Sequence, residues 1–262
     1  MKIATWNVNS LKVRLPHLLD WLATTQTDVV CLQELKCEDK SFPLADIETA
    51  GYRAVFNGQK TYNGVAILTR AETVGEPQDV LRNIPDFEDE QRRIIAATVH
   101  GVRVVCGYFP NGQAVGSEKF EYKMRWLAAL TDWLRGELAT HSQLVLAGDY
   151  NIAPEDRDAT PEWQDDIHVS EPEREAFQAL VGLGLTDAFR MFEQPEKSYS
   201  WWDYRMMAFR RNIGLRIDHL LVSAALREQV SACVVDKAPR KLERPSDHAP
   251  VVLTLADDRS AA

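Results

Sequence analysis

The sequence is poor in cysteine. Its 262 residues include four, Cys31, Cys37, Cys106 and Cys233, with no Cys-x-x-Cys spacing of the kind that metal and redox motifs use. Cys31 and Cys106 lie inside apolar runs, where a free thiol behaves as a small hydrophobic group. These two residues are therefore predicted to be reduced thiols in the core.

Long hydrophobic runs are also missing. No apolar stretch approaches the roughly 20 residues that a membrane helix needs. The first residues, Met1 to Trp6, have the pattern of a strand and no signal-peptide or transit-peptide character. Together with the cysteine usage, these features predict a cytoplasmic protein that makes no contact with a membrane.

An excess of positive charge is absent from the chain as a whole, which carries a net charge of −9. A general polyanion-binding protein is therefore not expected. The segment 197–244 differs, because it holds ten Lys or Arg against five Asp or Glu, a net charge of +5. A basic face on an acidic body fits a protein that holds nucleic acid at one surface, although chance clustering is the alternative.

The remaining composition, 45% hydrophobic and 26% charged, is that of an ordinary globular domain. No linker-like segment and no internal repeat is visible, so we expect a single domain over residues 1–256 and a frayed tail at 257–262. Many strand patterns with hairpin turns and several helix patterns favour an α/β fold, with two mixed β-sheets packed face to face and helices outside.

Periodicity gives the expected elements. Helices are predicted at 10–24 with Ser10 as N-cap, 43–50, 120–138 and 173–183. Strands are predicted at 2–8, 29–32, 52–56, 64–69, 93–99, 102–108, 144–147, 216–222, 230–235 and 251–255. Residues 71–90 read as irregular and 153–172 as a long loop.

Polar side chains recur where buried strands end. The apolar stretch Leu144 to Ala147 runs into Asp149 and Asn151, which point to the same side because strand side chains alternate. Alone, these residues are those of an ordinary turn. Similar polar tips elsewhere on the chain favour a shared site for a cation, a water or a phosphate. They are Asn7, Glu34, Tyr108, Asp218 and the pair Asp247 and His248.

These tips belong to motifs that occur in a recognisable order. The motifs are Asn7-Val8-Asn9, Leu32-Gln33-Glu34, Gly107-Tyr108-Phe109-Pro110-Asn111-Gly112, Gly148-Asp149-Tyr150-Asn151, Ser200-Trp201-Trp202-Asp203-Tyr204, Arg216-Ile217-Asp218 and Ser246-Asp247-His248. Over nearly the whole chain, this series resembles the exonuclease III family of DNA-repair nucleases. The resemblance implies a four-layer α/β sandwich like that of deoxyribonuclease I, and a metal-dependent nuclease acting on damaged or terminal DNA.

The resemblance also implies a metal site. Mg²⁺, with Mn²⁺ as a substitute, prefers carboxylate oxygens and retains several waters. Glu34 is the leading ligand, and Asn7 or Asn9 together with Asp247 are expected to complete or support the site.

Five polar residues are expected to carry the hydrolysis. Asp149 would take the proton of the attacking water, and Asn151 would orient that water or a phosphate oxygen. His248 would donate to the phosphate, with Asp218 holding its tautomer. Spacing alone leaves open whether Asp149 or His248 is the base. Tyr108 would donate to the phosphate or to the leaving oxygen, and a packed tyrosine is its alternative reading.

The contacts to DNA are expected mainly near the basic segment. The resemblance places Trp201, Leu215 and Ile217 around a pocket for a base-less sugar. The remaining contacts are assigned to Asn111 and to phosphate-facing arginines, Arg205, Arg210 and Arg211.

One position departs from the family pattern, which has a small residue six before an arginine. Here the arginine is Arg174 and the residue is His168. We expect His168 to intrude on the path used to cut at an internal abasic site and so to bias the enzyme toward 3′ ends. In the alternative reading, His168 points to solvent and changes nothing.

The sequence thus predicts a Mg²⁺-dependent DNA phosphodiesterase of base-excision repair that processes 3′ ends as a 3′→5′ exonuclease and 3′-phosphatase. One alternative is a full endonuclease that cuts 5′ to internal abasic sites. Others are a phosphatase of another substrate class, such as inositol phosphates, and a non-catalytic DNA-binding module. The expected partner is double-stranded DNA with nicks, 3′ blocks or abasic sites, bound by a monomer.

Overall fold

The computed structural model of the protein describes residues 1–164 and 166–256. Its strands form two six-stranded mixed sheets. The first has the order β11 (Val230–Val235), β12 (Val251–Leu255), β1 (Lys2–Asn7), β2 (Val29–Gln33), β4 (Val65–Arg70) and β3 (Tyr52–Asn57). The second has the order β5 (Gln78–Arg82), β6 (Ile94–Val99), β7 (Val102–Tyr108), β8 (Leu144–Asp149), β10 (Asp218–Ser223) and β9 (Leu185–Asp187).

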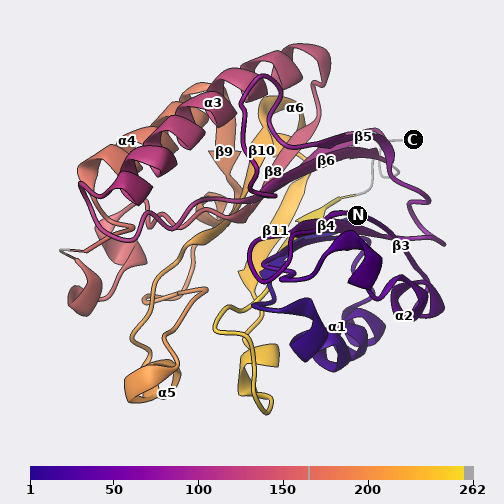
Figure 1. Ribbon diagram of the computed structural model, residues 1–262, viewed down its shortest axis with the longest axis horizontal. Helices are drawn as coiled ribbons and strands as arrows, with labels where there is room; N and C mark the ends of the chain where they lie inside the picture. Colours follow the sequence, from indigo (N-terminus) through magenta and orange to yellow (C-terminus); the bar gives the residue numbers. More distant parts are fainter. Residues whose placement is uncertain (165, 257–262) are drawn as a thin grey trace.

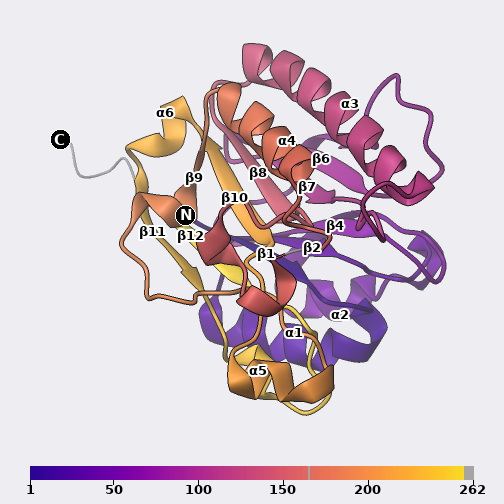
Figure 2. The same cartoon turned by 90° about the vertical axis from the view of Figure 1, so that its left-hand side faces the viewer.

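Helices cover the outer face of each sheet, so the chain has four layers (Figures 1 and 2). The first sheet carries α1 (Leu11–Thr25) and α2 (Leu44–Thr49), and the second carries α3 (Glu118–Thr140) and α4 (Glu171–Gly182). Two short helices are α5 (Ala208–Arg211) and α6 (Ala224–Arg227). Single 3-10 turns lie at Asp39–Ser41, Asp156–Asp158, Pro161–Trp163, Ala188–Met191, Arg205–Met207 and Pro239–Lys241.

The core follows from the alternation of strand side chains. In β8, Val145 and Ala147 enter the cluster between the two sheets. Leu144 and Leu146 instead point to the cluster under α3 and α4. A third cluster fills the space between the first sheet and its helices. The strands in the middle of each sheet are therefore buried on both faces. The predicted four-layer α/β sandwich is confirmed.

Parallel pairing brings the polar strand ends to one edge. β1 runs parallel to β2 with Asn7 opposite Gln33, and β7 runs parallel to β8 with Tyr108 opposite Asp149. β10 is antiparallel to β8 and begins at Asp218, opposite the same Asp149. Carboxyl ends of two parallel pairs and the start of β10 thus meet at one end of the sandwich.

The differences from expectation lie at sheet edges and at one helix start. Strand β5 was read as irregular, because a register shift between Gln78 and Leu81 breaks its alternation. The three-residue edge strand β9 was too short to give a pattern. Ser10 occupies the N-cap position of α1, but its side chain makes no capping hydrogen bond and its φ is 85°.

Three further expectations concern cysteines, membrane spans and the tail. All four cysteines are free and buried, as predicted for Cys31 and Cys106. Among the described residues, none of the helices combines the length and apolar character required to cross a bilayer. The expected frayed tail at 257–262 lies outside the described residues.

Candidate functional site

Three residues that are distant in the sequence meet at the shared edge. Glu34, Asp149 and His248 each offer one atom able to bind a metal, and these atoms all lie within 4.8 Å of one another. The Asn7 amide nitrogen donates to a Glu34 oxygen at 2.9 Å and to Asp149 Oδ2 at 2.9 Å. The end of β1 therefore holds together the two carboxylates that follow β2 and end β8.

The donor set suits a hard divalent cation, because it offers two carboxylates, one buried on Asp149 and one partly exposed on Glu34. Glu34 keeps a side-chain exposure of 18% while pairing with Lys36 at 3.1 Å. The side-chain oxygen of Asn7, the atom that would bind a metal, points away from the two carboxylates and accepts from the Asn9 backbone at 2.9 Å. Its amide hydrogens face the carboxylates. The amide of Asn7 thus orients Glu34 and Asp149.

Asp247 lies outside the group of three residues that could hold a metal. Its two carboxylate oxygens accept from Asn9 Nδ2 at 3.0 Å and from Trp201 Nε1 at 2.9 Å. In this arrangement Asp247 supports the site by fixing Asn9 and Trp201. Of the two acidic residues expected at the metal, Glu34 belongs to the three-residue group and Asp247 does not.

His248 stands between two carboxylates. Its Nδ1 lies 2.8 Å from Asp218 Oδ2, and its Nε2 lies 3.6 Å from Asp149 Oδ2. Ser200 fixes Asp218 by donating to the same Oδ2 at 2.7 Å. Burial alone would lower the pKa of His248, but the charges of Asp218 and Asp149 outweigh burial and raise it to about 10.

Burial is the main influence on the pKa of Asp149. Desolvation raises the pKa of its carboxyl to about 7, although His248 acts in the opposite direction and lowers it. A group that gains and loses a proton near neutral pH suits a general base. His248, protonated at the same pH, suits a donor to a phosphate oxygen.

Tyr108 closes the site on the side of β7. Burial raises the pKa of its phenol well above the usual value, and the charges of Glu34 and Asp149 add to that rise. Tyr108 therefore remains a hydrogen-bond donor at any ordinary pH. It also lines a groove of about 730 Å³, whose walls include Gln59, Tyr62, Asn63, Gln91, Arg93, Pro110, Asn111, Gly112, Gln113, Lys119 and Tyr122.

Asn151 is fixed in a left-handed backbone conformation, with φ of 51°. Its N–H donates to Asp149 Oδ1 at 3.0 Å, and its side-chain amide donates to the Phe109 carbonyl at 3.0 Å. These bonds turn the side-chain oxygen of Asn151 toward Asn111 Nδ2, at 3.4 Å.

His168 lies inside the site, and the solvent-facing reading is wrong. The residue is only 7% exposed, and its Nδ1 is 2.7 Å from the Asn151 carbonyl. Its Nε2 lies 3.5 Å from Asn111 Nδ2. Its φ of 81° is a conformation that glycine adopts more readily than any other residue. Burial and the nearby Lys123 charge lower the pKa of His168 to about 3.

This buried neutral histidine predicts a pH-dependent stability. Its pKa is lower in the folded chain than the roughly 6.5 of the unfolded chain, so the unfolded state takes up a proton first as the pH falls. Its contribution is present above about pH 6.5 and is lost toward pH 3. Acidification from about pH 7.5 to about pH 5 should cost wild type up to about 2 kcal/mol more than His168→Gly. Urea unfolding measures this difference, and parallel pH profiles would contradict it.

The apolar wall around Trp201 is built but covered. Leu215 is 0% and Ile217 2% exposed, so neither lines an open pocket in this state. Trp163 packs edge-on against Trp201, with ring centroids 5.2 Å apart, and Val169 joins the same cluster. The assignment of these three residues to a sugar pocket therefore stays a prediction, and such a pocket would open only if Trp163 moved away from Trp201.

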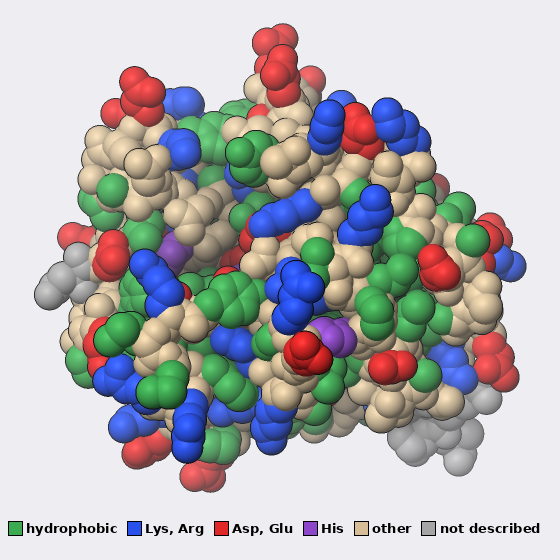
Figure 3. Space-filling model, turned by 60° about the horizontal axis from the view of Figure 1, so that its bottom comes forward, with side chains coloured by type: hydrophobic (Ala, Val, Ile, Leu, Met, Phe, Trp, Pro, Cys, Tyr) green, Lys and Arg blue, Asp and Glu red, His purple; other side chains and the backbone are tan. Residues whose placement is uncertain are grey.

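One part of the basic segment, the loop that contains α5, projects from the body of the fold (Figure 1). Arg205, Arg210 and Arg211 are all exposed, but Arg205 is paired with Asp203 at 2.6 Å. Met206 and Met207 in the same loop are 77% and 65% exposed. On the face in Figure 3, Lys and Arg side chains alternate with hydrophobic ones at the lower left. Sequence reasoning missed the two methionines, which stand beside an arginine in a segment without apolar periodicity.

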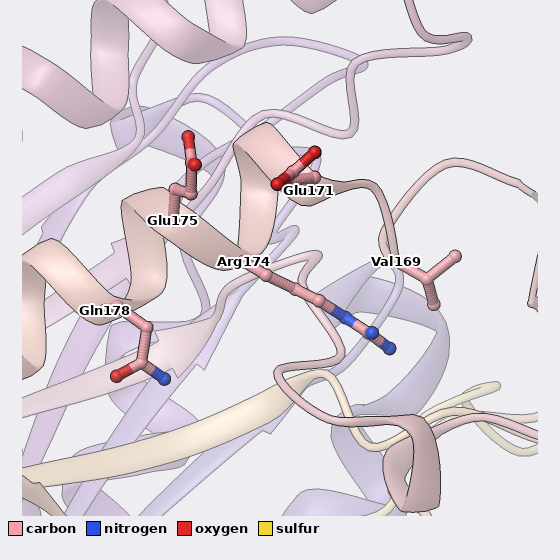
Figure 4. A pocket seen from close by; sticks show the side chains of 5 residues that line it. All are labelled: Val169, Glu171, Arg174, Glu175 and Gln178. Atoms are coloured by element: carbon pink, nitrogen blue, oxygen red, sulfur yellow. The ribbon is translucent and has the colours of Figure 1, made fainter.

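A separate pocket of about 500 Å³ lies at the start of α4. Its walls are formed by Val169, Glu171, Arg174, Glu175 and Gln178, which point in different directions (Figure 4). Arg174 is engaged with Asp156 at 2.7 Å. None of Glu34, Asp149 and His248 lines this pocket, so it is separate from the candidate functional site.

The comparisons with known proteins agree with this geometry. Residues 4–248 match the endonuclease/exonuclease/phosphatase family. Exodeoxyribonuclease III of Haemophilus influenzae is 38% identical, with 96% of this chain and 98% of the relative aligned. The 3′ phosphatase NExo from Neisseria, solved with a product DNA hairpin, is 50% identical and has a TM-score of 0.94 over 98% of this chain and all of that one.

A third relative is an AP endonuclease from Archaeoglobus fulgidus, which is 37% identical and has a TM-score of 0.92 over 97% of this chain and 99% of the other. Similarity of this kind covers nearly the whole chain. The chain therefore belongs to the endonuclease/exonuclease/phosphatase family and, within it, to the exonuclease III group of nucleases, as its motifs predict.

Proposed function

We propose that the protein is a Mg²⁺-dependent DNA phosphodiesterase of base-excision repair that processes 3′ ends of duplex DNA, as a 3′→5′ exonuclease and 3′-phosphatase. The observation that carries this proposal is the convergence of Glu34, Asp149 and His248 within 4.8 Å. Residues 1–256 act as one catalytic domain. The relatives support the proposal, since the Neisseria protein is described as a 3′ phosphatase and a 3′-5′ exonuclease.

Glu34 would hold the metal, with Mg²⁺ the physiological ion and Mn²⁺ a substitute. A bound ion would supply positive charge to the phosphoryl oxygens. Asp149 would accept the proton of the attacking water, since its pKa of about 7 is matched to that task. Asn151, held by Asp149 and Phe109, would orient the water through its side-chain oxygen.

The remaining donors would face the phosphate. His248 would donate from Nε2, since Asp218 holds its Nδ1 at 2.8 Å. Tyr108 would donate to a phosphate oxygen or to the leaving 3′-oxygen, and Asn111 would contact the strand beside it. Each of these donors acts where negative charge grows, which is the arrangement that lowers a phosphoryl-transfer barrier.

DNA is the partner, and we assign its path to the groove lined by Tyr108 and to the loop around α5. Arg210 and Arg211 would neutralise backbone phosphates, whereas Arg205 must first leave Asp203. The exposed Met206 and Met207 suit insertion between bases or sugars at a nick. A monomer would act on nicked duplexes, 3′-blocked ends and abasic sites.

We assign the preference for 3′ ends to His168. Its ring fills the space between Asn111 and the Asn151 carbonyl, and Trp163 covers the wall formed by Trp201. An internal abasic sugar would have to displace the rings of His168 and Trp163. A terminal phosphate needs to approach only the three-residue group of Glu34, Asp149 and His248.

A substrate panel with His168→Gly tests this assignment. For wild type, removal of a 3′-phosphate at a nick should exceed cleavage at an internal abasic analogue by at least about 10²-fold, the cost of a misplaced reacting phosphate. The variant should gain abasic cleavage and keep 3′-phosphatase activity within about threefold, well below that cost.

Equal abasic cleavage by the two proteins would contradict the role of His168 and favour a full abasic-site endonuclease. An inositol phosphate in the same panel separates the DNA enzyme from a phosphatase of another class. Omission of the metal ion, with no loss of turnover, would contradict metal dependence.

A further inference from the structure

A buried histidine directly after Asp218 has no role in the chemistry described above. His219 is fully buried, and its ring packs edge-on against Tyr150 at 4.9 Å and Phe177 at 5.2 Å. Its Nδ1 lies 3.0 Å from Arg216 Nη1, and its Nε2 lies 2.8 Å from the Ile152 carbonyl. Both ring nitrogens are therefore engaged, one by a cation and one by the backbone.

The partners fix the tautomer of this ring. A guanidinium nitrogen can only donate, so Nδ1 of His219 must accept from Arg216. The proton of the neutral ring is then on Nε2, which donates to the Ile152 carbonyl. Burial and the Arg216 charge also lower the pKa of His219 to about 4, so the ring stays neutral at physiological pH.

Arg216 itself cannot move. It is 1% exposed, donates from Nε to Asp158 at 2.7 Å and donates from Nη2 to Asp187 at 2.9 Å. Asp158 is also paired with Arg190. Because Asp158 and Asp187 bind the other nitrogens of Arg216, Nη1 points toward His219. The imidazole is therefore held by a buried ion cluster.

The acceptor at the other end belongs to the catalytic turn. Ile152 follows Asn151, whose own carbonyl accepts from Lys123 at 2.7 Å and faces His168 at 2.7 Å. Two successive carbonyl groups are thus held by buried side chains of different elements. These contacts fix the turn that carries Asp149 and Asn151.

We propose that His219 is a positioning residue that connects the Asp158–Arg216 ion pair to the Ile152 carbonyl and so sets the position of Asn151 against the phosphate. The effect on rate rests on the proposed function, because it is read from 3′-phosphatase activity. A small displacement of a positioned group is enough to slow an enzyme strongly.

The test pairs two substitutions at one site. His219→Phe keeps the ring packing against Tyr150 and Phe177 but removes both hydrogen bonds. His219→Gln keeps a donor for the Ile152 carbonyl and an acceptor for Arg216. We expect the Phe variant to lose about 10²-fold in kcat with KM changed less than about threefold, and the Gln variant to recover at least about tenfold of that loss.

Nitrogen-15 NMR of the wild-type ring supplies a readout that does not depend on activity. We expect the Nε2–H tautomer, with its proton coupled across the bond to the Ile152 carbonyl. An Nδ1–H tautomer would contradict the proposed link from Arg216 through His219 to the Ile152 carbonyl. A folded Phe variant with wild-type kcat, or a Gln variant as slow as the Phe variant, would contradict it as well. A wild type inactive on 3′ ends would contradict the proposed function instead, while the tautomer would still decide that link.

Discussion

Replacing Asp149 by Asn is expected to lower kcat on a nicked 3′-phosphate duplex by about 10²–10⁴-fold, the range for loss of a general base. Asn has nearly the same shape and still accepts the Asn151 N–H that Asp149 holds at 3.0 Å. It cannot take a proton from water, and burial has brought the pKa of Asp149 to the pH at which that transfer is efficient. Single-turnover rates with saturating Mg²⁺ measure the loss.

The fold should survive this change. Asp149 lies beside Glu34 and Asp218, so its replacement relieves repulsion among three neighbouring carboxylates. The same change removes the attraction to His248, which offsets that gain. The control is therefore an unfolding curve, which should show no large loss of stability. A folded Asp149→Asn variant with a rate within about tenfold of wild type would exclude Asp149 as the base.

Replacing Glu34 by Gln is expected to raise the Mg²⁺ concentration needed for half-maximal activity by at least about tenfold, the lower end for a disturbed metal site. Glu34 is the partly exposed carboxylate of the three-residue group, and Asn7 orients it at 2.9 Å. A Gln keeps that contact and removes the charge that attracts the ion. The activity measured against Mg²⁺ concentration gives the shift.

Glu38 supplies a matched control on the same loop. Its side chain is 42% exposed, and its one ion pair within the described part of the chain is with exposed Lys40 at 3.0 Å, so Glu38→Gln should leave the Mg²⁺ dependence unchanged. Equal shifts in the two variants would point to a general charge effect, and no shift in Glu34→Gln would remove Glu34 from the metal site.

The fold was predictable where strands are buried on both sides. In β8 the apolar run and the Gly148-Asp149 end mark both the strand and its polar tip, and β1 and β2 behave alike. The edge strands β5 and β9 were not predictable, because a bulge or a length of three residues leaves no periodicity to recognise. Pairing within the sheets depends on long-range contacts that no local pattern contains.

The sequence pointed to residues that converge at one edge of the sandwich, but not to the way they are arranged. The amide of Asn7 faces the carboxylates because the Asn9 backbone takes its oxygen, which spacing cannot indicate. The buried Lys123–Glu173 pair that supports the Asn151 turn left two signals that were not used. Lys123 falls on the apolar face of α3, and Glu173 stands three residues after Ser170 in a capping box.

The packing of Trp163 against Trp201 could not be predicted from the sequence either. The 153–172 segment has no apolar periodicity, so its aromatic residue looked like part of a solvated loop. Its position depends on the backbone bond from Thr160 to Gly214 and on the bridge between Ala159 and Leu215. Both are tertiary contacts between segments more than 50 residues apart.

The most direct measurement is an anomalous diffraction map from crystals of the protein soaked with Mn²⁺. Convergence of the strand ends on a divalent ion predicts one strong peak within about 2.5 Å of a Glu34 carboxylate oxygen, on the side that faces Asp149. A peak elsewhere, with none beside Glu34 and Asp149 in crystals of active protein, would contradict the metal site and the mechanism built on it.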